Sequence, residues 1–174
     1  DLVFPIPKTD KDQKPIFQIK NNKYSTVKEC KKYSNNRLIN FAHLFNGALI
    51  NLNTVKKIGN INLSLYHHGS EIDYYYRLSE MGNIFTCCDA LHFHPDINKR
   101  SINNLWIYYY LMNSMLVNKK YLNFYFLRNI KVIIATLIRI YQRNGLKYFF
   151  FKFFLNKNIF IFFKAIFKGI FNKI

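Results

Sequence analysis

Acidic side chains near the middle of the chain are the best candidates for chemistry. Residues 69–82 read GSEIDYYYRLSEMG and contain Glu71, Asp73 and Arg77. A carboxylate in this position is suited to general-base catalysis, because it accepts a proton from a hydroxyl that attacks an electrophilic carbon. Asp73 lies at the third helical position, where a charge related to helix capping is the usual interpretation. On these residues alone, a solvated loop acid remains the simpler interpretation of Glu71, and Arg77 is more simply structural.

Two short segments on either side of this acidic loop add polar candidates. Residues 45–50 read FNGALI, in which Asn46 and Gly47 shape a binding pocket or Gly47 only permits a turn. Residues 90–95 read ALHFHP, in which His94 is either a metal ligand or an ordinary histidine at the end of a strand. The adjacent Cys87 and Cys88 lack the paired ligand spacing of a structural zinc site.

An α/β framework must position these residues. We expect a strand over residues 2–6, a buried strand over residues 41–50 and a strand over residues 84–94. A short helix over residues 54–58 is predicted to start at an Asn53 N-cap and to stop at Gly59. A second helix is predicted within residues 69–82, with Ser70 as its cap and Gly82 at its end. From Asn103 onward the pattern is helical.

The order of four segments, FNGALI, KKIG, GSEIDYYYRLSEMG and ALHFHP, resembles the acceptor-side half of family 2 glycosyltransferases. The resemblance is to rhamnosyltransferase- and galactofuranosyltransferase-like members, and it implies a GT-A (nucleotide-diphospho-sugar transferase) fold. The segment WIYYYLMNSM, residues 106–115, extends it, although Met112 stands where Arg is usual in that family. Gly169 is similar to a glycine in the closing helix of such relatives.

The resemblance also implies roles for individual residues. Glu71 would be the catalytic base, with Asp73 beside it, and His94 would complete a divalent-metal site for Mg or Mn in the complete enzyme. Acceptor contacts are implied for three residues: Asn46, Gly47 and Arg77. Asp73 would orient the acceptor or brace the loop, and Arg77 would tie the loop to the helix through a carboxylate pair. The chain also departs from the family pattern, since the base is Glu where Asp is usual, neutral Ser70 precedes it where another acid is common, and no Asp-x-Asp motif precedes FNGALI.

These departures lead us to expect a C-terminal fragment that is inactive alone and binds neither a sugar nucleotide nor a metal ion strongly. Residues 1–100 would form part of the GT-A catalytic domain, and residues 101–174 would form a helical tail. The complete enzyme would transfer a sugar from a nucleotide-sugar donor to a saccharide or lipid-linked acceptor, by inversion, in surface polysaccharide synthesis.

The charge distribution points to an anionic partner for the tail. The chain has a net charge of +17, and all nine acidic residues lie between Asp1 and Asp96. Fourteen Lys and Arg follow without a single acid, among aromatic and aliphatic residues spaced as on amphipathic helices. No stretch reaches the ~20 uncharged residues that span a bilayer. We expect the tail to lie on the anionic inner face of the cell membrane, which makes the enzyme cytoplasmic and peripheral.

Two other functions are compatible with this composition. One is a basic peripheral membrane protein without enzymatic activity, in which residues 41–95 are only scaffold. The other is a nucleic-acid binder held by charge. The sequence contains no recognisable nucleic-acid-binding motif, and its aromatic residues follow an amphipathic pattern, so no nucleic acid is expected as a partner.

Overall fold

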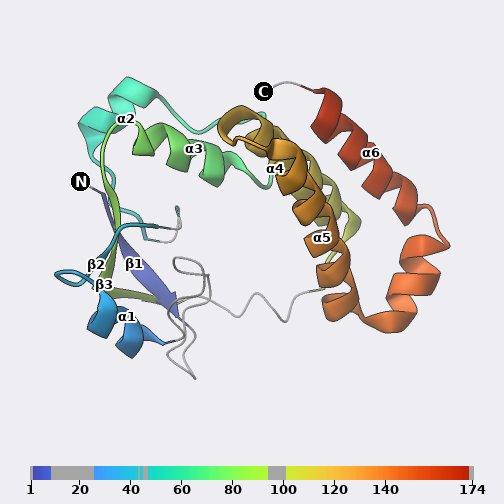
Figure 1. Cartoon of the computed structure of the whole chain (residues 1–174), viewed down its shortest axis with the longest axis horizontal. Helices are drawn as coiled ribbons and strands as arrows, with labels where there is room; N and C mark the ends of the chain where they lie inside the picture. Colours follow the sequence, from blue (N-terminus) through green and yellow to red (C-terminus); the bar gives the residue numbers. More distant parts are fainter. Residues whose placement is uncertain (1, 9–25, 43, 45–46, 94–100, 173–174) are drawn as a thin grey trace. The chain divides into compact units, whose positions relative to one another are not determined.

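The computed structural model describes residues 2–8, 26–42, 44, 47–93 and 101–172, which form two compact units (Figure 1). Unit 1 consists of residues 1–61 and 74–97, and unit 2 consists of residues 62–73 and 98–174. The division falls within the helix α3 (Ser70–Ser79). The first turn of α3 therefore belongs to unit 2, and the remainder belongs to unit 1.

Unit 1 is built on a three-stranded mixed sheet in the order β1-β3-β2 (Figure 1). Its strands are β1 (Leu2–Lys8), β2 (Leu38–Ile39) and β3 (Ile84–Phe93). The central strand β3 pairs in parallel with β1 and antiparallel with β2. The β1–β3 register shifts between Pro5 and Ile6. A proline has no N–H to donate to a neighbour, so β1 suits the edge of the sheet.

Local capping explains the two short helices of unit 1. In α1 (Val27–Tyr33), the side chains of Thr26 and Glu29 exchange hydrogen bonds with each other's backbone N–H. In α2 (Leu52–Ile58), the Oδ1 of Asn51 accepts from the backbone N–H groups of Asn53 and Thr54. The N-cap is therefore Asn51, and the prediction of Asn53 was wrong. The predicted stop at Gly59 is confirmed, with φ 76°.

The hydrophobic core of unit 1 gathers residues from most of its elements. One cluster joins residues before α2 to α3 and the start of β3: Ala42, Leu44, Tyr74, Leu78 and Ile84. A second joins α1 to β2 and β3: Val27, Cys30, Ile39 and Cys88. Burial raises the pKa of the Cys30 thiol to about 11, so this cysteine behaves as an inert core residue.

The segment predicted as a buried strand over residues 41–50 is not one in its described part. Gly47 has φ 76° and turns the chain, and Leu49 is 73% exposed. The apolar run predicts continuous burial, whereas only Ala42 and Leu44 are buried in the core and Ala48 and Ile50 pack against it partly exposed. The glycine breaks the extended backbone that a strand would need.

Unit 2 is helical and is organised around α4 (Asn104–Tyr121). The helices α5 (Tyr125–Lys147) and α6 (Asn158–Phe171) both pack against α4, and the π-helix η2 (Tyr148–Phe154) connects them (Figure 1). The Oδ1 of Asn103 caps α4 by accepting from the backbone N–H of Trp106 at 2.8 Å. Every residue from Leu111 to Val117 is buried, which is why α4 shows no single apolar stripe.

The structure confirms the predicted strands at residues 2–6 and 84–93, and the helices that begin after Asn103. The helix predicted within residues 69–82 is also present, but Ser70 is its first helical residue and the helix ends at Ser79, before Gly82. None of the helices in the described part of the chain is both long and apolar enough to cross a bilayer. The GT-A half-domain and its boundary at residue 100 stay predictions.

Candidate functional site

The loop that precedes Glu71 is fixed to α4 by Asn113. The Nδ2 of Asn113 donates hydrogen bonds to the backbone oxygens of Tyr66, at 2.9 Å, and His68, at 2.6 Å. Asn113 is fully buried, so these bonds form away from water. Gly69 has φ +97°, and a Cβ atom there would lie 3.0 Å from the Cβ of Asn113. A side chain at position 69 would therefore strain the backbone and press on α4.

Glu71 lies in the first turn of α3, and its carboxylate folds back onto this loop. Its Oε2 accepts a hydrogen bond from the backbone N–H of Gly69 at 3.0 Å. Its Oε1 lies 3.2 Å from the Nδ1 of His68, and the Glu71 side chain stays 31% exposed. Glu71 thus stands in the first turn of the helix, where the helix dipole attracts an acidic side chain. Glu71 is therefore a partly exposed carboxylate whose direction is set by two donors.

His68 is the second of these two partners of Glu71, and its side chain is largely buried. Burial lowers the pKa of His68 below its ordinary value of 6.5, although the nearby Glu71 carboxylate opposes this, and Arg139 and His67 lower it further. A lowered pKa favours the neutral imidazole at pH 7, and the Nδ1 of that ring lies within hydrogen-bonding distance of the Glu71 carboxylate. A neutral partner orients the carboxylate without removing its negative charge.

Aromatic rings on α4 support His68. The ring of Tyr110 lies 4.7 Å from His68, and Trp106 stacks on Tyr110 at 4.5 Å with an interplanar angle of 9°. The guanidinium of Arg139, from α5, lies 5.0 Å from the Tyr110 ring centroid in cation–π geometry. The His68 ring is therefore held by α4, and α4 is in turn contacted by α5.

A second aromatic group consists of Tyr66 and His67 from this loop and Tyr109 from α4. Tyr66 and Tyr109 meet edge to face at 5.2 Å, and Tyr66 stacks on His67 at 5.8 Å. Tyr66 and His67 are exposed. Exposed aromatic faces with hydroxyl groups offer both stacking and hydrogen bonding to a polar ring.

Asp73 lies two residues after Glu71 but in a different environment. It is fully buried, and its Oδ1 accepts from the Nζ of Lys120 at 2.8 Å and the Oη of Tyr121 at 2.7 Å. Burial would lower the pKa of Lys120, but its hydrogen bonds with Asp73 and Tyr121 raise it. Of the two roles predicted for Asp73, this geometry favours bracing, because the carboxylate ties the first turn of α3 to the end of α4.

The residues predicted to contact an acceptor are divided between the described and undescribed parts of the chain. Gly47 is exposed, with φ 76°. Arg77 donates hydrogen bonds to the backbone oxygens of Ile58 and Asn60, each at 2.9 Å, and its guanidinium lies 4.8 Å from the Tyr74 ring centroid. Arg77 thus secures the end of α2. Asn46 and the predicted metal ligand His94 lie outside the described residues.

No group of three or more His, Cys, Asp and Glu side chains that could hold a metal ion is found within the described ranges. His68 and Glu71 lie side by side as a pair, whereas the buried Asp73 carboxylate accepts a hydrogen bond from Lys120. The predicted ligand His94 lies outside these ranges, so the divalent-metal site stays a prediction.

Sequence reasoning missed four residues that position the site: His68, Asn113, Lys120 and Tyr121. Asn113 lies in the WIYYYLMNSM segment, so the resemblance contained a signal for it. The other three leave no pattern, since a histidine before a turn and a Lys-Tyr pair at the end of a helix are ordinary surface features. Only the contact between α4 and the Glu71 loop gives them a role.

Comparison with known proteins gives partial similarity to a glycosyltransferase. The chain is 44% identical over 55 residues to galactofuranosyltransferase GlfT1 from two strains of Mycobacterium tuberculosis, CDC 1551 / Oshkosh and ATCC 25618 / H37Rv. The match covers 31% of this chain and spans 18% of the length of those relatives. No family model matches the chain, and no solved structure matches it.

Proposed function

We propose that this chain is the acceptor-side part of a family 2 glycosyltransferase in which Glu71 is the general base. The complete enzyme transfers a sugar from a nucleotide-sugar donor to a saccharide or lipid-linked acceptor, with inversion at the anomeric carbon. The observation that carries the proposal is the state of the Glu71 carboxylate. It is partly exposed, it lies at the start of a helix, and Gly69 and His68 fix its direction.

In the proposed reaction, the acceptor hydroxyl approaches the exposed side of the Glu71 carboxylate. Glu71 accepts the hydroxyl proton as the oxygen attacks the anomeric carbon, and the bond to the nucleoside diphosphate breaks. The donors from Gly69 and His68 keep the carboxylate in one rotamer, so little reorganisation is needed before proton transfer. A Glu in place of the family's usual Asp extends the base by one methylene group, and these two contacts compensate by folding the carboxylate back.

The aromatic group of Tyr66, His67 and Tyr109, in which Tyr66 and His67 are exposed, is the proposed acceptor platform. Sugar rings present C–H faces that stack on aromatic rings, and their hydroxyl groups pair with phenol and imidazole groups. Tyr66 and His67 immediately precede the loop that holds Glu71. The partial similarity to a galactofuranosyltransferase makes a galactofuranosyl donor the first candidate, and the resemblance to rhamnosyltransferase-like members makes a rhamnosyl donor the second.

The test is turnover by the polypeptide extended to its natural start and compared with the 174-residue chain. Release of nucleoside diphosphate from galactofuranosyl and rhamnosyl donors is measured with an oligosaccharide or a polyprenyl-linked acceptor. Replacing Glu71→Gln should lower kcat by roughly 100- to 10,000-fold with little change in donor binding, because it removes only the base.

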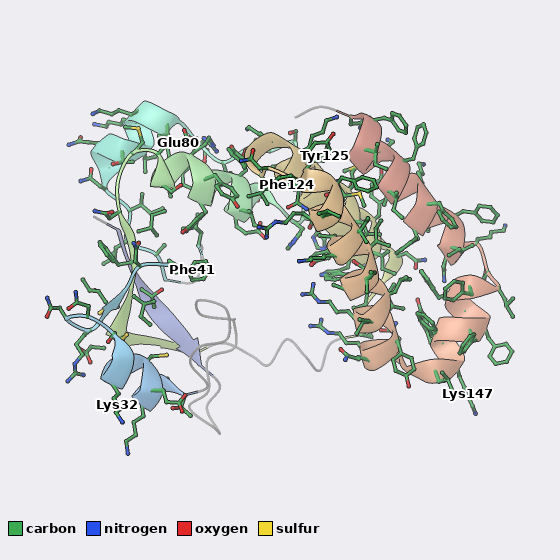
Figure 2. All side chains as sticks on the ribbon, in the orientation of Figure 1. Lys32, Phe41, Glu80, Phe124, Tyr125 and Lys147 are labelled. Atoms are coloured by element: carbon green, nitrogen blue, oxygen red, sulfur yellow. The ribbon has the colours of Figure 1, made fainter. Side chains whose placement is uncertain are left out.

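Glu80→Gln is the matched control, since Glu80 is an exposed acid just beyond the end of α3 (Figure 2). It should leave kcat unchanged. Turnover that survives Glu71→Gln would remove Glu71 as the base. If no polypeptide containing this chain releases diphosphate with any donor, the non-enzymatic alternative gains instead.

A further inference from the structure

The outer side of α6 carries a stripe of exposed phenylalanines, here named the Phe face: Phe160, Phe163, Phe167 and Phe171. Their side chains are between 59% and 70% exposed. The opposite side of α6 is the one that packs, through Phe162, Ala165 and Gly169, all of them buried. The helix is therefore attached to unit 2 by one face, and the Phe face is not needed for that attachment.

The neighbouring π-helix extends this apolar surface. In η2 and the residue after it, four large side chains are also exposed: Phe150, Phe151, Phe154 and Leu155. Figure 2 shows that many side chains of η2 and α6 project outward from the ribbon. Monomeric soluble proteins rarely expose a contiguous apolar surface of this kind, and such surfaces usually mark an interaction site.

Basic side chains accompany these aromatic residues. Lys164 and Lys168 are exposed beside the Phe face, and Lys152 and Lys157 are exposed on and after η2. Lys147, just before η2, is also exposed (Figure 2). The sequence contains no Asp or Glu after Asp96, so nothing acidic balances them in the helical tail. The chemistry required of the partner is thus an apolar layer next to negative charge.

We infer that the Phe face and η2 form a docking surface for an anionic lipid bilayer, with α6 lying parallel to the membrane. The phenylalanine rings enter the boundary between headgroups and acyl chains, and the lysines extend to the lipid phosphates. This inference is independent of the proposed transferase activity, because it uses none of the residues around Glu71. It also identifies which residues of the tail would contact the bilayer, and the composition of the tail alone does not do so.

A bilayer fits this surface better than the other partners of matching charge. A nucleic acid is bound by aromatic rings that stack singly on bases, whereas the Phe face repeats at helical spacing and forms one continuous stripe. A second copy of the chain would place like charges against each other, since the face carries lysines and no acids. Each lysine near an anionic surface raises binding about fivefold.

The test is flotation of the 174-residue chain with vesicles of phosphatidylcholine containing about 30% phosphatidylglycerol. Replacing Phe160→Ser together with Phe167→Ser should lower the partition coefficient by at least roughly tenfold. The matched control is Leu49→Ser with Leu52→Ser, which removes two equally exposed apolar side chains of unit 1 and should have no effect. Circular dichroism of each variant establishes that it remains folded.

A second variant separates charge from apolar insertion. Lys164→Gln with Lys168→Gln should weaken binding to the anionic vesicles and leave the weaker binding to pure phosphatidylcholine unchanged. The inference is overturned if the folded Phe variant binds as well as the parent, or if the Leu49→Ser with Leu52→Ser control loses as much binding as the Phe variant. It is also overturned if the chain ignores vesicles and instead forms a dimer, or binds RNA, through the Phe face.

Discussion

The contact between His68 and Glu71 shows how one neutral side chain prepares a charged one. A protonated imidazole at 3.2 Å would pair with the carboxylate and weaken it as a base, whereas the neutral ring only fixes its direction. Burial against Tyr110 keeps the pKa of His68 low enough for the neutral form to dominate at pH 7. The orientation of the proposed base therefore depends on the apolar packing of α4.

This arrangement predicts a pH dependence of stability. The pKa of His68 is lowered in the folded state from an ordinary value of 6.5, so the unfolded chain binds a proton more readily. The contribution of His68 is fully present above pH 6.5 and is lost as pH falls through the lower pKa of the folded state. Urea unfolding at about pH 7.5 and about pH 5.5 should give a lower midpoint at the acidic value.

His68→Gln should remove much of this difference, because glutamine has no proton to gain in that range. The adjacent His67→Gln is the control, since His67 is exposed, and it should retain most of the acid destabilisation. Equal loss of the difference in both variants would mean that His68 is not the group responsible. Glu71 and Arg139 also face His68, so both variants leave those charges in place.

At the scale of elements, the packing of α6 on α4 depends on the absence of a side chain at Gly169. A Cβ atom there would lie 2.8 Å from the Cβ and Sδ of Met115 and 3.2 Å from the backbone oxygen of Met112. Gly169→Ala gains about 1 kcal/mol of helix propensity but forces the two helices apart, which costs about 1–3 kcal/mol. We expect net destabilisation, measured as a lower denaturation midpoint.

Gly82→Ala provides the comparison for this substitution. Nothing lies within 4 Å of a Cβ at Gly82, and the residue is exposed after the end of α3. The change there should fall within about 0.5 kcal/mol of the parent. If Gly169→Ala were as stable as Gly82→Ala, the close approach of α6 to α4 would be incorrect.

The elements that the sequence predicted well are those with a local cause. The β3 strand is rich in β-branched and aromatic residues, and α4 starts at an Asn103 cap. The segment over residues 41–50 failed because apolar content cannot separate a strand from an apolar loop anchored at Ala42 and Leu44. The Asn51 cap was missed because two asparagines with the same propensity stand two residues apart.

For the candidate site, Glu71 and Asp73 were identified together, but sequence could not separate their environments. Asp73 is buried against Lys120 and Tyr121, and Glu71 is partly exposed. That difference arises because the first turn of α3 contacts the end of α4. Lys120 and Tyr121 lie 47 and 48 positions after Asp73 in the sequence, so no short motif encodes the contact. The roles of Asn46 and His94 stay predictions.

At the scale of the whole molecule, each of the two compact units is built from segments that are not contiguous in the sequence. Residues 62–73, including the Glu71 loop, belong with the helices that start after residue 98. Within unit 2, Asn113 and Tyr110 of α4 contact this loop. Glu71 and the helices that start after residue 98 therefore belong to one compact unit, and the domain boundary at residue 100 stays a prediction.

This division predicts how fragments behave. A fragment of residues 62–174 retains the loop and its contacts with α4, whereas residues 98–174 lose both. In the shorter fragment, Asn113 loses the two backbone oxygens it binds, and Lys120 and Tyr121 lose Asp73. Each buried polar group left without a partner costs about 1–3 kcal/mol.

We expect the longer fragment to melt cooperatively and the shorter one to melt at a clearly lower temperature, as followed by circular dichroism. Equal melting of the two would show that residues 62–73 do not contribute to the stability of unit 2, and the Glu71 loop would then lack the support from α4 that the proposed base requires.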